Sequence, residues 1–260
     1  MDKKKQTFLL VFLVLFFGAI NYNFIDGQLK NFLDDSDVKI VERVIDGDTI
    51  VVENNTHVRL LGINTPEKKE LYHDEAMNFL SGLILNKTIK LEYGKEKKDR
   101  YGRVLAYAIL DGKNINLEQV KNGFANYYIY DNDEYTTKLK DAWNECLVSG
   151  KNLCEKSRDK CSDCVELREL NIKEQEVIFY NKCNFECDLT KWNIKDEGRK
   201  NFIFPNFILK ENSEVKIIVG NKTNSDGILY WNEKDYVWTT GGDTLFLRDD
   251  AGRLVRWSSY

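Results

Sequence analysis

The sequence predicts an α+β domain followed by an all-β domain, and three observations lead to this expectation. Between residues 37 and 155, short segments of alternating apolar and polar residues come first, and segments with helical apolar spacing follow. From residue 177 onward, only short strands separated by turn signals are expected. A mostly charged stretch with cysteines, residues 156–171, is typical of a linker between them. We therefore expect a small β-barrel with packed helices over residues 37–155 and an immunoglobulin-like β-sandwich over residues 172–260.

Each element of the first domain follows from a local pattern. Residues 38–45 alternate apolar and polar side chains, which is typical of a half-buried strand, and the Asp-Gly pair after them is a turn signal. Further strands are expected at residues 50–52, 56–61, 88–93 and 104–109. Helices are expected at residues 75–85, 116–122 and 135–148, and Gly123 and Gly150 end the second and third of these.

The second domain shows short apolar runs between glycine-containing turns. Strands are expected at residues 177–181, 190–195, 201–204, 215–219, 244–248 and 254–260. Trp192 and Phe204 are expected in the core of this domain. Trp231, Tyr236 and Trp238 are expected either to pack into the core or to form a binding surface. Core packing is the favoured interpretation, because large aromatic side chains are mostly buried.

The first 36 residues have the pattern of an export signal or a membrane anchor followed by a polar spacer. Three lysines precede an apolar run at residues 8–20. Positive charge before such a run predicts that the rest of the chain lies outside the cytoplasm, either secreted or anchored in the membrane through residues 8–20. Whether the segment is cleaved stays open, since no clear cleavage site follows the run.

All six cysteines lie in the second half of the chain, which leaves two interpretations open. An even number of cysteines in an exported chain favours disulfides, but the sequence does not choose the pairing, and a local Cys183–Cys187 bridge is one option. The alternative is a zinc site built from Cys161, Cys164, Cys183 and Cys187, because zinc binds four thiolates at similar spacings.

Charge and motif patterns narrow the functional classes. The formal net charge of −4 excludes a wholesale basic wrapper of nucleic acid, so any such contact requires a local basic patch. Lys95, Lys97, Lys98, Arg100 and Tyr101 form one candidate patch, with an aromatic side chain for stacking.

Four other residues together have the chemistry that phosphodiester hydrolysis requires. Asp48 offers a carboxylate to a hard cation, and Glu67 offers a carboxylate to a water molecule. Arg59 and Arg103 offer planar, permanently charged groups to the phosphate in its transition state. Acidic and basic residues in loops are usually only solvated, so this pattern by itself is a weak indication.

Three ordered motifs resemble the thermonuclease (staphylococcal nuclease) family. They are VIDGDT at residues 44–49, VRLLGINTPE at residues 58–67 and DRYGRVLAY at residues 99–107. The resemblance covers about residues 37–155. It implies a five-stranded OB-fold barrel with three helices. It also implies calcium-dependent endonuclease activity that hydrolyses DNA, RNA or both to 3′-phosphate products.

The resemblance also implies roles for individual residues. Asp48 and the backbone carbonyl of Thr65 would hold calcium, and Asn64 would stand at the position of a second calcium ligand. Glu67 would act on the attacking water. Arg59 would neutralise the phosphate, and Arg103 would act on the transition state and the leaving group. Substrate contacts would come from Arg100, Tyr101, Tyr128 and Tyr130.

Asn64 is a departure, because the best-known member of the family has a second calcium-binding carboxylate at this position. An amide oxygen still binds Ca²⁺ but carries one negative charge fewer. We therefore expect weaker calcium affinity and acceptance of other divalent ions such as Mg²⁺.

Residues 172–260 resemble the lamin-tail domain family. The supporting strings are VIFYN at residues 177–181, CDLTKWNIKD at residues 187–196 and GDTLFLRD at residues 242–249. The resemblance implies a domain that binds or localises rather than catalyses, with a ligand that the sequence does not identify.

The leading hypothesis is an exported metal-dependent nuclease with an accessory β-sandwich. The alternatives are a non-catalytic nucleic-acid-binding module and a surface adhesin on the same folds. The joint presence of Asp48, Arg59, Glu67 and Arg103 favours the enzyme, because a binding module has no need of all four.

Overall fold

The computed structural model describes residues 37–129 and 132–260. The predicted leader at residues 1–36, with its apolar run, and the predicted stacking residue Tyr130 lie outside these ranges. Within them, no helix is both long and apolar enough to cross a membrane. Residues from Val38 to Tyr260 form one compact unit that contains two hydrophobic cores.

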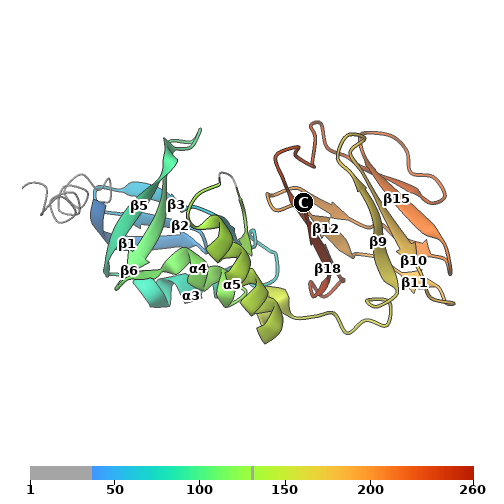
Figure 1. The fold of residues 1–260 in the computed structure, drawn as a ribbon, viewed down its shortest axis with the longest axis horizontal. Coiled ribbons are helices and arrows are strands. Elements are labelled where there is room, and N and C mark those ends of the chain that lie inside the picture. Colours follow the sequence, from blue (N-terminus) through green and yellow to red (C-terminus); the bar gives the residue numbers. More distant parts are fainter. Residues whose placement is uncertain (1–36, 130–131) are drawn as a thin grey trace, which may run out of the picture. The chain divides into compact units, whose positions relative to one another are not determined.

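The first domain is a five-stranded mixed β-barrel, which confirms the expected fold (Figure 1). Its strands are β1 (Asp37–Asp46), β2 (Thr49–Val52), β3 (Thr56–Leu60), β5 (Thr88–Lys98) and β6 (Val104–Leu110). They are ordered β3-β2-β1-β5-β6, and a parallel pairing of β3 with β6 closes the barrel. Short strand β7 (Lys113–Asn114) extends the sheet, and β4 (Ile63–Asn64) pairs with β8 (Asn126–Tyr127).

Three helices pack on this barrel, as predicted, at its lower and right side in Figure 1. They are α3 (His73–Ile84), α4 (Ile115–Lys121) and α5 (Thr136–Ser149), and a 3₁₀ turn, η1 (Asn152–Cys154), follows. Helix α3 buries Ala76, Leu80 and Ile84 at a spacing of four residues. Helix α5 ends at Gly150, whose φ of 61° is the left-handed conformation that glycine adopts easily.

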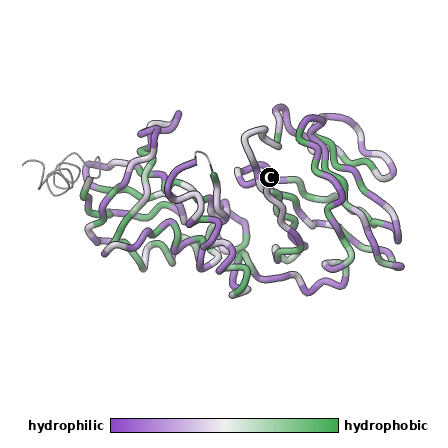
Figure 2. The backbone as a smooth tube through the Cα atoms, in the orientation of Figure 1, coloured by the Kyte–Doolittle hydropathy of each residue, from purple (hydrophilic) through white to green (hydrophobic). Residues whose placement is uncertain are grey.

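Strand β5 is longer than the sequence pattern suggests. The expected strand ended at residue 93, but β5 continues through Lys98, so Lys95, Lys97 and Lys98 belong to a hairpin arm. The register against β6 is irregular between Tyr93 and Lys98. The end of this arm is hydrophilic in Figure 2.

The second domain is all-β, as predicted, and its two main sheets lie side by side in Figure 1. One sheet has the order β16-β15-β10-β9 and the other β13-β12-β17-β18, and a small β11–β14 pair completes the domain. The strands are β9 (Val165–Asn171), β10 (Glu176–Asn181), β11 (Cys187–Asp188), β12 (Asn193–Lys195), β13 (Asn201–Ile203), β14 (Ile208–Leu209), β15 (Glu214–Val219), β16 (Ile228–Trp231), β17 (Thr244–Arg248) and β18 (Leu254–Ser259).

The segment expected as a linker contributes to the second domain. Residues 165–171 form strand β9, which pairs antiparallel with β10. The cysteines pair as Cys146–Cys154, Cys161–Cys187 and Cys164–Cys183. The local Cys183–Cys187 bridge and the four-thiolate zinc site are therefore not formed, because each of these sulfurs has another partner. Two of the disulfides fasten the start of β9 to its own domain.

The aromatic residues of the second domain follow the favoured interpretation. Trp192 and Phe204 are buried. Trp231 and Trp238 are buried against each other, with their ring centroids 5.8 Å apart. Tyr236 is exposed, so these three aromatic residues do not form one binding surface.

Aromatic side chains of β17 and β18 pack against the first domain. Phe246 belongs to the hydrophobic core of the barrel, and its ring centroid lies 5.4 Å from that of Trp143 in α5. The ring centroid of Trp257 lies 6.3 Å from that of Trp143. Arg248, which is buried, donates a hydrogen bond of 2.6 Å to the Leu153 carbonyl. The two domains are therefore joined by a buried contact as well as by the connecting chain.

Candidate functional site

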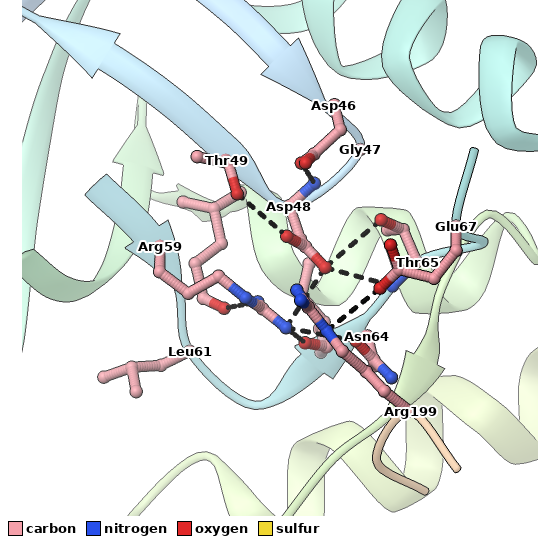
Figure 3. A network of polar contacts seen from close by, with 12 residues as sticks. Asp46, Gly47, Asp48, Thr49, Arg59, Leu61, Asn64, Thr65, Glu67 and Arg199 are labelled. Atoms are coloured by element: carbon pink, nitrogen blue, oxygen red, sulfur yellow. Dashed lines mark hydrogen bonds and ion pairs between the residues drawn. The ribbon is translucent and has the colours of Figure 1, made fainter. Parts of the chain in front are cut away.

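Five of the residues predicted to serve the site come together at one end of the barrel (Figure 3). Asp48 lies in the turn between β1 and β2, Arg59 in β3 and Asn64 in β4. Thr65 and Glu67 follow in the loop after β4. The barrel thus brings together side chains from three strand ends.

Asp48 is buried, and both of its carboxylate oxygens accept hydrogen bonds. Oδ1 accepts from the Thr49 hydroxyl at 3.0 Å, and Oδ2 accepts from the Thr65 backbone N–H at 3.1 Å and its hydroxyl at 3.2 Å. The turn packs so closely here that a Cβ on Gly47 would lie 2.7 Å from Thr65 Cγ2. Glycine is therefore required at this position, and it lets Asp48 meet Thr65.

Asp46 is a second carboxylate at this turn, which the sequence analysis did not assign to the site. Its Oδ1 accepts a hydrogen bond of 3.0 Å from the Asp48 N–H. Burial, followed by the negative charge of Asp48, raises the pKa of Asp46. The Asp-Gly-Asp spacing was the available signal, but only Asp48 of this motif was predicted to bind the metal.

Arg59 is fixed in a buried position by carbonyl groups and by Asp48. Its guanidinium donates to the carbonyls of Leu60 at 2.5 Å and Ile63 at 2.7 Å, and to Asn64 Oδ1 at 3.3 Å. It also forms an ion pair of 3.1 Å with Asp48. Burial lowers the pKa of Arg59, Asp48 opposes this effect, and the positive charges of Arg199 and Arg103 add to it. Arg59 thus has a single defined orientation beside two other arginines.

Glu67 lies in a more open part of the site. Its backbone N–H donates to the Glu70 carboxylate at 2.7 Å. Its own Oε1 lies 2.9 Å from Nε of Arg199, and the two side chains are 46% and 53% exposed. Arg199 comes from the second domain, and nothing in the sequence pattern indicated that it would reach this site.

Arg103, predicted as a catalytic residue, forms a second group at the β5–β6 hairpin with the predicted substrate contacts Arg100 and Tyr101. Arg103 Nε lies 2.7 Å from Asp99 Oδ2. Arg100 and Arg103 lie over the ring of Tyr101, at 4.9 and 5.7 Å from its centroid, and this ring is exposed. Burial raises the pKa of Asp99, but hydrogen bonds from Arg103 and Tyr101 lower it by more, so the net shift is downward. The hairpin therefore presents two cations and an aromatic face together.

Tyr128 lines a groove beside this region. Its backbone N–H donates to the Gly62 carbonyl at 2.8 Å. The groove has a volume of about 170 Å³, and Leu61, Leu105 and Tyr107 also line it. The neighbouring Tyr127, not assigned from sequence, is instead buried against Trp143.

The second domain reaches the site through the loop between β12 and β13, residues 196–200, here called the β12–β13 loop. Asn64 Nδ2 donates to the carbonyls of Glu197, at 3.3 Å, and of Gly198. Next to the loop, Lys195 Nζ donates to Glu70 at 2.7 Å. The Glu-Gly pair at residues 197–198 predicts a turn between strands, but no local pattern indicates that this turn contacts the barrel.

Comparisons with known proteins agree with the geometry of both domains. Residues 57–156 match the family described as "Staphylococcal nuclease homologue", and residues 162–260 match the family described as "Lamin Tail Domain". A "Thermonuclease" of Staphylococcus intermedius is 32% identical over 167 residues, which is 59% of this chain and 99% of that protein. A "Thermonuclease" of Staphylococcus hyicus is 36% identical over 123 residues, 44% of this chain and 73% of that protein. The "Endonuclease YncB" of Bacillus subtilis is 35% identical over 112 residues, 38% of this chain and 53% of that protein.

Proposed function

The chain belongs to the staphylococcal nuclease family and carries a lamin tail domain, and on this basis we propose that it cleaves DNA, RNA or both in a calcium-dependent reaction that leaves 3′-phosphate ends. The observation that carries the proposal is that Asp48, Arg59 and Glu67 lie together at one site. Arg103 is near enough for its positive charge to lower the pKa of Arg59. This set combines a buried carboxylate, an open carboxylate and two arginines. A module that only binds has no use for the open carboxylate beside the arginines.

The oxygen donors at this end of the barrel fit a hard cation. Calcium takes about six to eight oxygen ligands, with water and substrate filling the positions that the protein leaves. The Asp48 carboxylate, the Asn64 amide and the Thr65 carbonyl are oxygen donors in adjacent segments, and Asp46 adds a neighbouring carboxylate. Within residues 37–129 and 132–260, no group of three or more His, Cys, Asp or Glu side chains is clustered as a metal site. The ion would therefore depend on amide, carbonyl and phosphate oxygens, and it would supply positive charge to the phosphate.

The residues of the chain would have different roles in the reaction, with a buried, fixed Arg59 and a more exposed Glu67. Arg59, held by the Leu60 and Ile63 carbonyls, would bind a phosphate oxygen without having to reorient. Glu67, half exposed, would accept a proton from the attacking water. Arg103 would stabilise charge on the leaving oxygen, and its partner Asp99 holds its Nε in place.

Substrate binding would use the hairpin and the groove described above. Arg100 and Tyr101 would bind the terminal phosphate of the strand, and Tyr128 would offer an aromatic face to a base. Because the chain has a net charge of −4, this local patch must supply the attraction. Binding should therefore weaken as salt rises.

We also propose that the protein acts outside the cytoplasm. Its three disulfides are typical of an oxidising compartment, and the apolar run at residues 8–20 would direct export or anchor the chain. The lamin tail domain would then localise the nuclease, on a ligand that is unidentified.

Cleavage assays on the full-length protein test this function. We expect degradation of single-stranded DNA and RNA with Ca²⁺, with 3′-phosphate ends, and none with chelator. Glu67→Gln and Arg103→Ala should each lower the rate by about 10²-fold or more, as expected when a general base or a charged transition-state contact is removed. Glu42→Gln and Arg43→Ala, on the exposed side of β1, are the matched controls. Binding without cleavage under every ion would instead favour the non-catalytic alternative.

A further inference from the structure

The β12–β13 loop places a positive charge of the lamin tail domain inside the nuclease site. Arg199 Nε lies 2.9 Å from Glu67 Oε1, and Figure 3 shows the Arg199 side chain directed at the residues around Asp48 and Arg59. We propose that Arg199 is a third phosphate-binding arginine of the nuclease, supplied by the lamin tail domain, and that Asn64 holds the loop that carries it. This inference rests on the function proposed above.

The backbone on either side of Arg199 is firmly anchored. The Glu197 carboxylate accepts from the Ile129 N–H at 3.0 Å and from the Thr244 hydroxyl at 2.9 Å, and both bonds are buried or partly buried. The Asp196 carboxylate accepts from the Lys200 N–H at 2.8 Å. A Cβ on Gly198 would lie 3.1 Å from this same carboxylate, so the loop is tightly closed. The loop therefore presents Arg199 from a fixed base.

The Arg199 side chain itself remains available to a ligand. It is 53% exposed, and its partner Glu67 is 46% exposed. Ion pairs between such exposed groups contribute little stability, since water and salt compete with them. A phosphodiester could thus displace Glu67 from Arg199 and leave the carboxylate free to act on water.

Each of the three arginines is paired with a carboxylate, and only the pair of Arg199 with Glu67 is about half exposed. The positive charges of Arg103 and Arg199 both reach the buried Arg59, in addition to the effect of burial. Asp48 already neutralises Arg59, and Asp99 neutralises Arg103. A phosphate in its transition state carries more negative charge than one arginine balances, and guanidinium groups match its geometry.

The hydrogen bonds of the Asn64 side chain hold the β12–β13 loop, and they require an amide at residue 64. Its Oδ1 accepts from Arg59, while its Nδ2 donates to the carbonyls of Glu197 and Gly198. A carboxylate has no hydrogen to donate and would face two carbonyl oxygens at this place. The family departure at Asn64 therefore joins the barrel to the loop that bears Arg199.

Oligonucleotide binding and cleavage by the full-length protein test this role. We expect Arg199→Ala to weaken binding of a labelled single-stranded DNA about tenfold, the effect of losing one hydrogen bond to a charged group. Anisotropy would be measured with Ca²⁺ in a Glu67→Gln background, in which cleavage is suppressed. The slope of log Kd against log salt should fall by about 0.7, because one phosphate contact is lost. Arg199→Lys should restore the salt slope, and Arg43→Ala should change neither quantity.

Several results would overturn this inference. Unchanged binding by Arg199→Ala would remove the arginine from the substrate site. Faster cleavage by Arg199→Ala would show that its pairing with Glu67 inhibits the enzyme instead. In an Asn64→Asp background the further effect of Arg199→Ala should shrink, and an undiminished effect would remove Asn64 from the argument. If the unmodified protein bound DNA through Arg199 but never cleaved it, the proposed nuclease function would fail while this inference stood.

Discussion

Arg59 in the barrel and Arg199 in the lamin tail domain both face the candidate site, but the protein holds them by different means. Arg59 is buried, and its guanidinium itself is bonded to carbonyls and to Asp48. Arg199 is half exposed: its guanidinium has an exposed ion pair with Glu67, and buried or partly buried hydrogen bonds hold the loop at Glu197 and Lys200. The barrel thus fixes a charge in advance, whereas the second domain supplies a charge that can move to a ligand. Substitutions of Arg59, and of the residues that hold the β12–β13 loop, should therefore differ in their effects on stability and on cleavage.

Arg59→Ala should produce the largest effect, because it removes the fixed charge and leaves Asp48 buried without its ionic partner. Loss of one member of a buried ion pair costs about 3–5 kcal/mol, so the free energy of unfolding should fall by about that amount. Cleavage should be lost at the same time. Urea denaturation, followed by fluorescence, measures the first effect. Arg43→Ala is the control, since the Arg43 side chain is exposed and its hydrogen bond to Asn55 lies at the surface. A loss of cleavage without loss of stability would mean that Arg59 is not needed to balance Asp48.

The anchor of the β12–β13 loop can be weakened by pH, which gives the second prediction. Burial, and next the nearby Asp243, raise the pKa of Asp196 to about 7, although Lys200 and Lys195 oppose this. Because the folded-state pKa lies above the unfolded value of 3.8, the stabilisation is fully present below about pH 4. It is lost as the pH rises toward 7, since the buried carboxyl group must ionise. The contribution is about 4 kcal/mol.

Asp196→Asn should flatten this part of the pH dependence of unfolding, because asparagine keeps an acceptor for the Lys200 N–H without an ionisable group. Urea denaturation at several pH values between 4 and 8 measures the slope. Asp226→Asn, at an exposed turn, is the matched control. If the slope of the Asp196→Asn variant equalled that of the unmodified protein, another buried carboxyl group would control this range.

The barrel elements could be predicted from sequence because their signals are local. Residues 38–45 alternate, and the Asp-Gly turn after them fixes where β2 begins. Strand β9 was missed because its outward-facing side chains are charged, so Val165 and Leu167 were not recognised as one face of a strand. The expected strand at residues 190–195 is interrupted by a turn, in which the Asp188 carboxylate accepts from the Thr190 N–H.

The parts of the site that escaped prediction depend on contacts between distant residues. Glu67 and Arg199 are in contact only because the two domains pack together. The periodicity of apolar residues within a strand or helix does not predict such a contact between domains. Disulfide pairing has the same origin, since it depends on the distance between Cα atoms in the fold, which is 5.3–5.8 Å here, and not on any spacing in sequence. Asn64 could be recognised as a departure from a family pattern, but its partners, Glu197 and Gly198, could not.

Asn64→Asp gives the smallest expected effect. It tests both the charge held in the barrel and the loop that carries Arg199. A second carboxylate beside Asp48 should tighten calcium binding in the absence of nucleic acid about tenfold, because Ca²⁺ affinity rises with ligand charge. The same change should loosen the β12–β13 loop, since Nδ2 no longer donates to its carbonyls. Calorimetric titration with Ca²⁺ measures the first effect, and hydrogen exchange at the Glu197 and Lys200 amides measures the second. Asn55→Asp, in the exposed turn before β3, is the control. Tighter calcium binding with an unchanged loop would mean that the packing of Phe246 and Trp257 on α5, rather than Asn64, holds the loop.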